Sequence, residues 1–194
     1  MSDVGTGHGR KTAAAFCLIA CFFAAAAVVI LGYDALERRK NPRPYFEYVS
    51  ECSVEYGVSI ELIYGIMSAE SGFDELAVSS AGACGLMQLM PSTFVWLCDD
   101  LGLDASGSDI FDPHLNIRCG VRYIAHLQER FGETETVIAA YNAGEGTVAR
   151  WLCDPTLSRD GKRLSSIPYS ETDEYCRRVM NLRDRYERLY FKNN

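Results

Sequence analysis

The sequence predicts an all-α protein in which one apolar N-terminal helix precedes a single helical domain. Three observations carry this prediction. Residues 12–33 form an uninterrupted apolar stretch without a charge. The later segments place apolar residues three and four positions apart, between capping residues, as amphipathic helices do. Apart from a short hairpin that we expect in the polar loop 154–168, no segment alternates apolar and polar residues as a strand does.

The stretch 12–33 is long enough to cross a bilayer, which takes about 20 apolar residues in a helix. Basic residues flank it on both sides, so charge does not fix its orientation. We expect residues 1–11 to be a short tail, 12–33 an uncleaved membrane anchor and 34–44 a charged linker that contains proline.

Two alternatives to an anchor stay open. One is a processed signal or lipoprotein segment, for which the small residues AAAA at 24–27 and the sequence LIAC at 18–21 are candidate processing sites. The other is a buried core helix. The anchor and the processed segment both place the body of the chain outside the cytoplasm, in the cell envelope.

Residues 45–194 are long enough for one domain with a hydrophobic core. The first predicted helix of this domain ends at Gly57, a plausible C-cap, and the next begins after Ser59 as N-cap. The predicted helices cover residues 44–57, 59–72, 91–102, 112–132, 133–144 and 170–191.

The two longest helices of the body carry the clearest end signals. The segment 112–132 has Asp112 as N-cap, Pro113 at the first helical position and Gly132 at its end. Before the last helix, Ser170 and Asp173 form a near capping box.

Charge and cysteine content exclude some classes of function. The formal net charge is −7, and beyond residues 1–40, which hold five Lys/Arg and three Asp/Glu, the body has 14 basic against 23 acidic residues. This balance argues against nucleic-acid binding. The three histidines show no metal-ligand spacing, so a zinc site is not expected. No feature of the sequence implies another metal or an organic cofactor. The six cysteines of the body are compatible either with disulfides or with small buried apolar residues.

Glu70 is the first candidate for chemistry. It lies at the C-terminal end of an apolar helix, where the carbonyl dipoles disfavour a negative charge. Burial there would also raise the pKa of the carboxyl group, and a carboxylic acid that keeps its proton near neutrality can protonate a leaving group. The alternative is a solvated glutamate at a frayed helix end.

Three further segments bring polar and adaptable side chains near such a site. The loop 77–91, AVSSAGACGLMQLMP, is rich in small residues, which let a backbone and a substrate approach closely. AAYNAGEG at 139–146 places a tyrosine and an asparagine at a helix end, and IPYSETDEY at 167–175 adds a glutamate and a tyrosine. Taken singly, each segment is equally well explained as core.

Taken together, the order ES, GLMQLMP, AYNAG and ET–Y resembles the lytic transglycosylases of the soluble, goose-lysozyme-like type (transglycosylase SLT domain). The resemblance extends from about Tyr45 to Tyr190. It implies a lysozyme-like α-helical fold. It also implies cleavage of the β-1,4 bond between N-acetylmuramic acid and N-acetylglucosamine in peptidoglycan.

The resemblance assigns roles to individual residues. Glu70 matches the catalytic acid. The residues that match substrate-binding positions are Ser71, Ser79, Met87, Gln88, Met90, Tyr141, Asn142, Glu171 and Tyr175. Two residues depart from the family pattern: Cys84 replaces a small apolar or hydroxyl residue, and Asp173 replaces a frequent arginine, which could alter binding of the charged peptide stem.

A single acid fits the mechanism that the resemblance implies. Ordinary glycosidases use two carboxylates. In a lytic transglycosylase, the 6-hydroxyl of muramic acid attacks its own anomeric carbon and gives a 1,6-anhydromuramic acid end. Two alternatives remain: a lysozyme-type hydrolase of the same fold, for which Asp74, Asp99 and Asp100 are weak candidates as second carboxylate, and a non-catalytic peptidoglycan-binding module.

Overall fold

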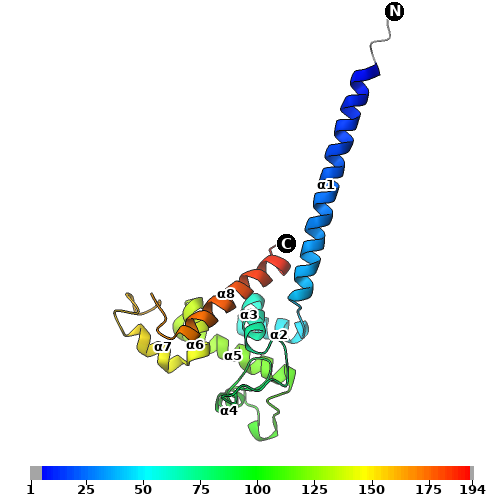
Figure 1. Cartoon of the computed structure of the whole chain (residues 1–194). Helices are drawn as coiled ribbons and strands as arrows, with labels where there is room; N and C mark the ends of the chain where they lie inside the picture. Colours follow the sequence, from blue (N-terminus) through cyan, green and yellow to red (C-terminus); the bar gives the residue numbers. More distant parts are fainter. Residues whose placement is uncertain (1–5, 193–194) are drawn as a thin grey trace, which may run out of the picture. The chain divides into compact units, whose positions relative to one another are not determined.

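The computed structural model describes residues 6–192, with side chains from residue 19 onward. The chain divides into two compact units, residues 1–42 and 43–194. The first unit contains α1 (Thr6–Lys40), one long helix that Figure 1 draws without a break. Within it, Ile19–Lys40 is long and apolar enough to span a membrane, and none of its apolar window is buried in the structure.

The helix α1 is longer than the sequence indicates. Residues 34–40, which we predict as linker, are helical and end in three basic residues at the last turn, where positive charge is favourable. Residues 34–40 thus continue the helix, and their role as a linker stays a prediction. Of the predicted tail, residues 6–11 are helical and residues 1–5 lie outside the described part.

The second unit contains seven α-helices and one 3₁₀ turn among its described residues. These are α2 (Phe46–Tyr56), α3 (Ile60–Glu70), α4 (Pro91–Asp100), η1 (Ala105–Gly107), α5 (Pro113–Phe131), α6 (Thr134–Ala143), α7 (Glu145–Leu152) and α8 (Ser170–Tyr190). Between residues 6 and 192 the β-type backbone pairing is limited to isolated bridges of Cys84 with Val78 and Leu89. The hairpin that we predict within 154–168 is wrong, because this loop contains turns, bends and irregular backbone but no strand.

The helix ends follow the sequence in part. Asp112 accepts a hydrogen bond of 2.8 Å from the backbone N–H of Leu115, and Gly57 closes α2 in the left-handed conformation. Ser59 occupies the N-cap position of α3 without a side-chain capping bond. The capping box expected around Ser170 is absent: Tyr169 is the N-cap of α8, without a side-chain cap, and Asp173 pairs with Arg177 instead.

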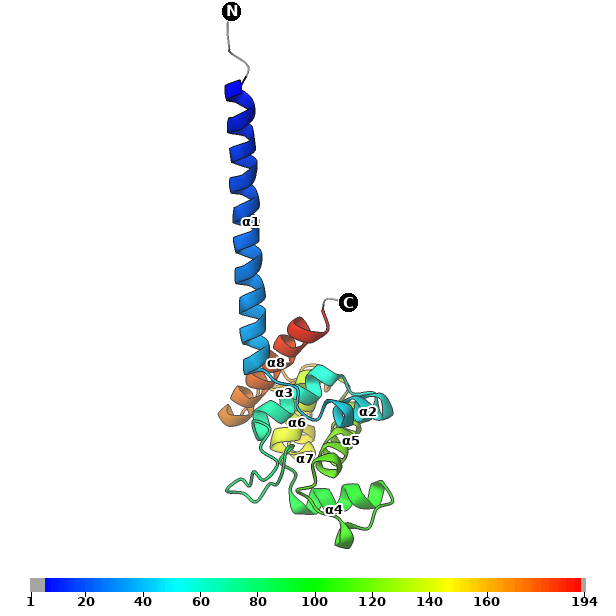
Figure 2. The same cartoon turned by 90° about the vertical axis from the view of Figure 1, so that its right-hand side faces the viewer.

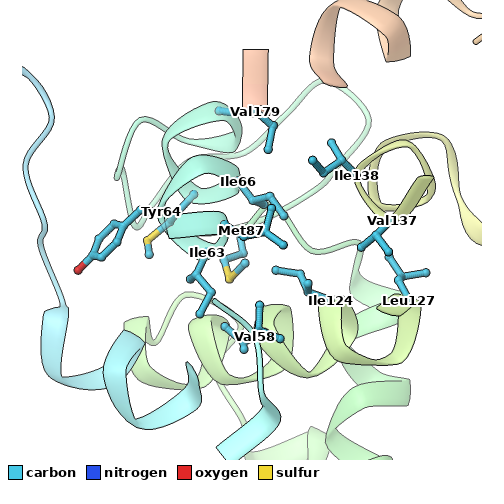
Figure 3. Packing of buried hydrophobic residues seen from close by; sticks show 14 of the residues in the cluster. Val58, Ile63, Tyr64, Ile66, Met87, Ile124, Leu127, Val137, Ile138 and Val179 are labelled. Atoms are coloured by element: carbon cyan, nitrogen blue, oxygen red, sulfur yellow. The ribbon is translucent and has the colours of Figure 1, made fainter. Parts of the chain in front are cut away.

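The core lies around α3, whose residues 62–67 are all buried. Figure 3 shows side chains from α3, α5, α6 and α8 converging on one cluster, with Met87 of the long loop 71–90 inside it. Helices α3 and α8 pack closely at Gly65, where an added Cβ would lie 3.2 Å from the backbone of α8. Figure 2 shows α3 and α8 next to each other. The hydrogen bond between Glu70, the last residue of α3, and Tyr175, in the first half of α8, marks the place of the candidate site.

The cysteines of the body are free thiols in the structure. Five of the six are buried, and Cys153 is exposed. Of the two interpretations left open by the sequence, the structure shows free thiols rather than disulfides, and five of the six are small buried apolar residues.

Candidate functional site

A cavity of about 530 Å³ opens beside the C-terminal end of α3. Its walls come from α3, the loop 71–90, the end of α6 and the first half of α8. The lining residues are Ala69, Glu70, Ser79, Gln88, Asn142, Glu171, Glu174, Tyr175 and Arg178.

Glu70 is the last residue of α3 and is half-buried in this cavity. The hydroxyl of Tyr175 donates a hydrogen bond of 2.5 Å to its Oε1. Burial raises the pKa of Glu70 to about 7, and the Tyr175 hydrogen bond and the positive charge of Arg178 oppose this rise. A carboxyl group with this pKa can both give and take a proton near neutrality.

The loop segment 85–89 is held by three side-chain hydrogen bonds, which come from the end of α3, from α6 and from α5. The Ser71 hydroxyl donates to the carbonyl of Leu86 at 2.8 Å, and the Tyr141 hydroxyl donates to the carbonyl of Met87 at 2.7 Å. The buried amide oxygen of Asn116 accepts from the backbone N–H of Met87 at 2.8 Å. The polar groups of the segment are thus satisfied by side chains from three helix regions, which fix its position.

Gln88 takes an unusual backbone conformation in this segment. Its φ of 48° lies in the left-handed region, which is sparsely populated by residues other than glycine. The side-chain amide nitrogen donates to the carbonyls of Gly85 and Ala77, at 2.9 and 3.1 Å. Both bonds use the amide nitrogen and fix the side chain where it lines the cavity. Strained residues of this kind concentrate at functional sites.

A second cavity of about 260 Å³ adjoins the first, because Gln88 and Asn142 line both. The second cavity is lined by Gln88, Leu89, Met90, Thr93, Tyr123, Tyr141, Asn142, Ala143 and Gly144. The shared asparagine is fixed by Thr172, whose hydroxyl donates to its amide oxygen at 2.8 Å. We refer to the two adjoining cavities together as the trough, and Glu70 lines the larger of them.

The structure brings most of the predicted site residues to this trough. Two of the predicted residues lie below it: Ser71 lines neither cavity and holds Leu86, and Met87 is completely buried under Gln88. Met87 was predicted as part of the cavity wall, but its own side chain lies in the hydrophobic core and lines neither cavity. Tyr141 lines the second cavity, but its hydroxyl is occupied by the Met87 carbonyl.

Among the lining residues that were not predicted from the sequence, Glu174 and Arg178 are the two that lie on α8. They lie three and seven positions after Glu171, and Tyr175 lies four positions after it. These four residues share one face of α8, so helical periodicity applied to the ET–Y segment would have found them. Arg178 also donates to the backbone carbonyl of Ala69, which connects α8 to the residue before the acid.

The two departures from the family pattern are both accommodated locally. The buried thiol of Cys84 contacts the carbonyl of Gly82, and Cys84 pairs with Leu89 and Val78 through the backbone. The carboxylate of Asp173 pairs with Arg177 at 2.7 Å, one turn along α8, and lies outside both cavities. In the described part of the chain, no group of three His, Cys, Asp or Glu side chains is arranged to hold a metal ion.

Comparisons with known proteins place this geometry in a family. The protein family described as "Transglycosylase SLT domain" matches this chain over residues 47–160, more than half of its length. The chain belongs to this transglycosylase family. The all-α fold predicted from the sequence and its lysozyme-like type are confirmed.

Curated relatives and solved structures extend this SLT domain assignment. The chain is 33% identical over 177 residues to membrane-bound lytic murein transglycosylase C of Sodalis glossinidius, covering 77% of this chain and 48% of the relative. It matches the lytic transglycosylase Slt of Pseudomonas aeruginosa with a TM-score of 0.68 and 30% identity, over 78% of this chain and 25% of that one.

The 70 kDa soluble lytic transglycosylase of Escherichia coli gives the same TM-score, 0.68, with 26% identity over 81% of this chain and 26% of that one. The chain thus spans less than half the length of these proteins. The similarity therefore concerns only the part of each protein that aligns with this chain.

Proposed function

We propose that this SLT domain is a peptidoglycan lytic transglycosylase that cleaves the β-1,4 bond between N-acetylmuramic acid and N-acetylglucosamine. The single observation that carries the proposal is the half-buried Glu70, with a pKa near 7, inside a trough of sugar size. The names of the relatives agree with it. The solved P. aeruginosa protein is described as an inactive mutant in which a glutamate is replaced by glutamine.

The first chemical step is protonation of the glycosidic oxygen by Glu70. Because burial disfavours the carboxylate, a substantial fraction of Glu70 holds its proton near neutral pH. The bond to the anomeric carbon then breaks, and positive charge develops on the sugar ring. The N-acetyl carbonyl of the muramic acid stabilises that charge.

In the second step Glu70, now a carboxylate, accepts the proton of the 6-hydroxyl as this oxygen attacks the anomeric carbon. The bond that forms gives a 1,6-anhydromuramic acid end. The nucleophile belongs to the same sugar, which gives it a high effective concentration and removes the need for a second catalytic carboxylate. Glu171 and Glu174 are exposed on the rim of the cavity, and we assign them to substrate contacts.

Product analysis on the full chain tests the reaction. Purified peptidoglycan is digested, and the fragments are weighed by mass spectrometry. We expect ends that are lighter by one water than those of a hydrolase, because transglycosylation adds none. Reducing ends alone would make the protein a lysozyme-type hydrolase, and binding without cleavage would make it a non-catalytic module.

The matched pair of variants is Glu70→Gln and Glu61→Gln, at opposite ends of α3. Glu70→Gln should lower the rate at least about a hundredfold, since the carboxamide keeps the shape but cannot supply the proton. Sugar binding should be largely retained. Glu61→Gln lies outside both cavities and should keep full activity. Equal activity of the two variants would remove Glu70 from the mechanism.

We further propose that α1 anchors residues 45–194 to a membrane, with this domain outside the cytoplasm. The support is the apolar helix Ile19–Lys40 and the membrane-bound relatives. The intact chain should stay with membranes after a high-salt wash. In cells whose outer layers are permeabilised but whose cytoplasmic membrane stays closed, an added protease should cleave the domain. Release by salt alone, or protection from protease, would contradict the anchor or its orientation.

A further inference from the structure

A row of aromatic rings leads from the trough onto the surface of α5 and α4. The ring of Tyr141 lies 5.4 Å from that of Tyr123, and Tyr123 lies 6.3 Å from His126 with the two planes 13° apart. Trp96 of α4 closes the row: its centroid is 5.1 Å from His126 and 6.1 Å from Tyr123, with its plane nearly perpendicular to both rings.

The row is continuous with the second cavity. Tyr123 and Tyr141 line that cavity, and so does Thr93, one helical turn before Trp96 on α4. Trp96 and Thr93 therefore share a face of this helix. The row begins at a ring in the trough and ends at a ring outside it.

The Trp96 side chain is unusually open for its type. It is 40% exposed, whereas Trp151, the second tryptophan, is 8% exposed and belongs to the core. Leaving a large aromatic face in water forgoes the free energy that its burial would provide. An exposed aromatic face next to a binding trough is therefore a surface suited to a ligand.

Polar groups border this surface. His126 Nε2 and Arg130 Nη1 both contact Oε2 of Glu145, each at 2.9 Å. The shared use of Oε2 by two donors fixes the carboxylate. Glu145 directly follows Gly144, which lines the second cavity. A flat aromatic face bordered by a fixed carboxylate and a guanidinium suits the two sides of a pyranose ring, its C–H face and its hydroxyl edge.

We propose that Trp96, with Tyr123 and His126 behind it, is an additional subsite that stacks one sugar of a β-1,4-linked glycan strand beyond the second cavity. The inference rests on the proposed function, because it takes the glycan to be the occupant of the trough. Trp96 would act in binding: it lengthens the part of the strand that is held and so favours long strands over short fragments.

The experiment measures KM on the full chain in detergent, with glycan strands of graded length. Trp96→Ala should raise KM for the longest strands about five- to tenfold, the loss of one stacked ring, and the advantage of long over short strands should shrink accordingly. Trp96→Phe keeps a ring and should recover most of the loss. Val95→Ala, at the neighbouring exposed position of α4, should match the wild type.

A binding measurement separates this inference from the reaction. In a Glu70→Gln background, oligomers of β-1,4-linked N-acetylglucosamine should change the tryptophan fluorescence, and Trp96→Phe should abolish the change. An unaltered KM for Trp96→Ala together with a silent Trp96 would overturn the subsite and leave the proposed reaction intact. Loss of the reaction in the wild type, with a fluorescence change still present, would overturn the reaction and leave a sugar-binding surface at Trp96.

Discussion

The hydroxyl of Tyr175 donates a 2.5 Å hydrogen bond to Oε1 of Glu70, although 105 positions separate the two residues in the sequence. The bond joins the C-terminal end of α3 to α8. Its effect on Glu70 opposes that of burial, because a donated hydrogen bond stabilises the carboxylate. The pKa of about 7 is thus a balance between two effects, and it can be shifted by removing one of them.

The Tyr175→Phe variant should move the alkaline limb of the pH–rate profile to higher pH. The acid role of Glu70 needs its protonated form, so the rate falls as pH rises through the pKa. Without the hydroxyl, only Arg178 still opposes the effect of burial. The pKa of Glu70 therefore rises above about 7, and Glu70 keeps its proton to higher pH. The measurement is kcat/KM against pH. Tyr169→Phe is the control, because Tyr169 is exposed and packs on Trp151. A limb that stays in place or moves to lower pH would contradict this account.

The same pKa shift makes Glu70 costly to fold above neutral pH. The folded pKa is raised from 4.5 to about 7, so between these values the folded state binds more protons than the unfolded state. The contribution of Glu70 to the free energy of unfolding is therefore fully present below about pH 4.5 and is lost as pH rises through about 7. The linkage limit is about 3 kcal/mol, reduced by partial exposure of the carboxylate.

Glu70→Gln should remove this pH dependence. The variant should match the wild type near pH 4 and be more stable near pH 8, because the amide never has to ionise and its oxygen still accepts from Tyr175. Thermal unfolding at several pH values measures the difference. A Glu70→Gln protein that is no more stable at pH 8 than the wild type would show that the carboxylate is well solvated.

Much of this site could be predicted from the sequence, and the part that could not has a physical reason. Glu70 and Tyr175 stand in motifs whose residue types already indicate their chemistry. Asn116 does not, because its role is to fill backbone hydrogen bonds of a loop about 30 positions away. Its signal was a single polar residue on the apolar face of α5, four positions before Gly120 and eight before Ile124.

The short helix α7 was missed for a related reason. It begins at Glu145, directly after Gly144, with no side-chain cap and only eight residues. Tertiary packing of Val148 and Trp151, both buried, selects this helix more than any local pattern does. Local patterns therefore located the long helices and the acid, whereas supporting contacts between distant segments required the structure.

The Asn116→Ala variant should detach the loop that carries Gln88. Asn116 accepts from Met87 N–H and donates to the carbonyls of Cys84 and Ile110, at 3.1 and 2.8 Å. The truncation leaves three buried backbone groups without these partners, and we expect a loss of about 3 kcal/mol in the free energy of unfolding. Activity should fall in the protein that remains folded. Asn181→Ala, at an exposed position of α8, should change neither quantity. A folded, fully active Asn116→Ala protein would separate this asparagine from the site.

The last prediction concerns the space that Gly120 leaves for Met87. A Cβ added at Gly120 would lie 2.8 Å from Cβ and 2.9 Å from Cε of Met87, which is below normal contact. Both residues are completely enclosed, and Met87 N–H and C=O are fixed by Asn116 and Tyr141, so the loop cannot move aside without losing those bonds. Gly120→Ala should therefore cost about 1–3 kcal/mol despite the better helix propensity of alanine, and it should lower activity by displacing Gln88.

The same substitution at Gly146 in α7 meets only the Arg150 side chain at 3.9 Å, and there alanine should leave the protein as stable or raise its stability by up to about 1 kcal/mol. Thermal unfolding of the two variants in parallel gives the answer. Equal effects at the two glycines would mean that the Met87 side chain repacks freely, and that the loop below Gln88 is not held by this contact.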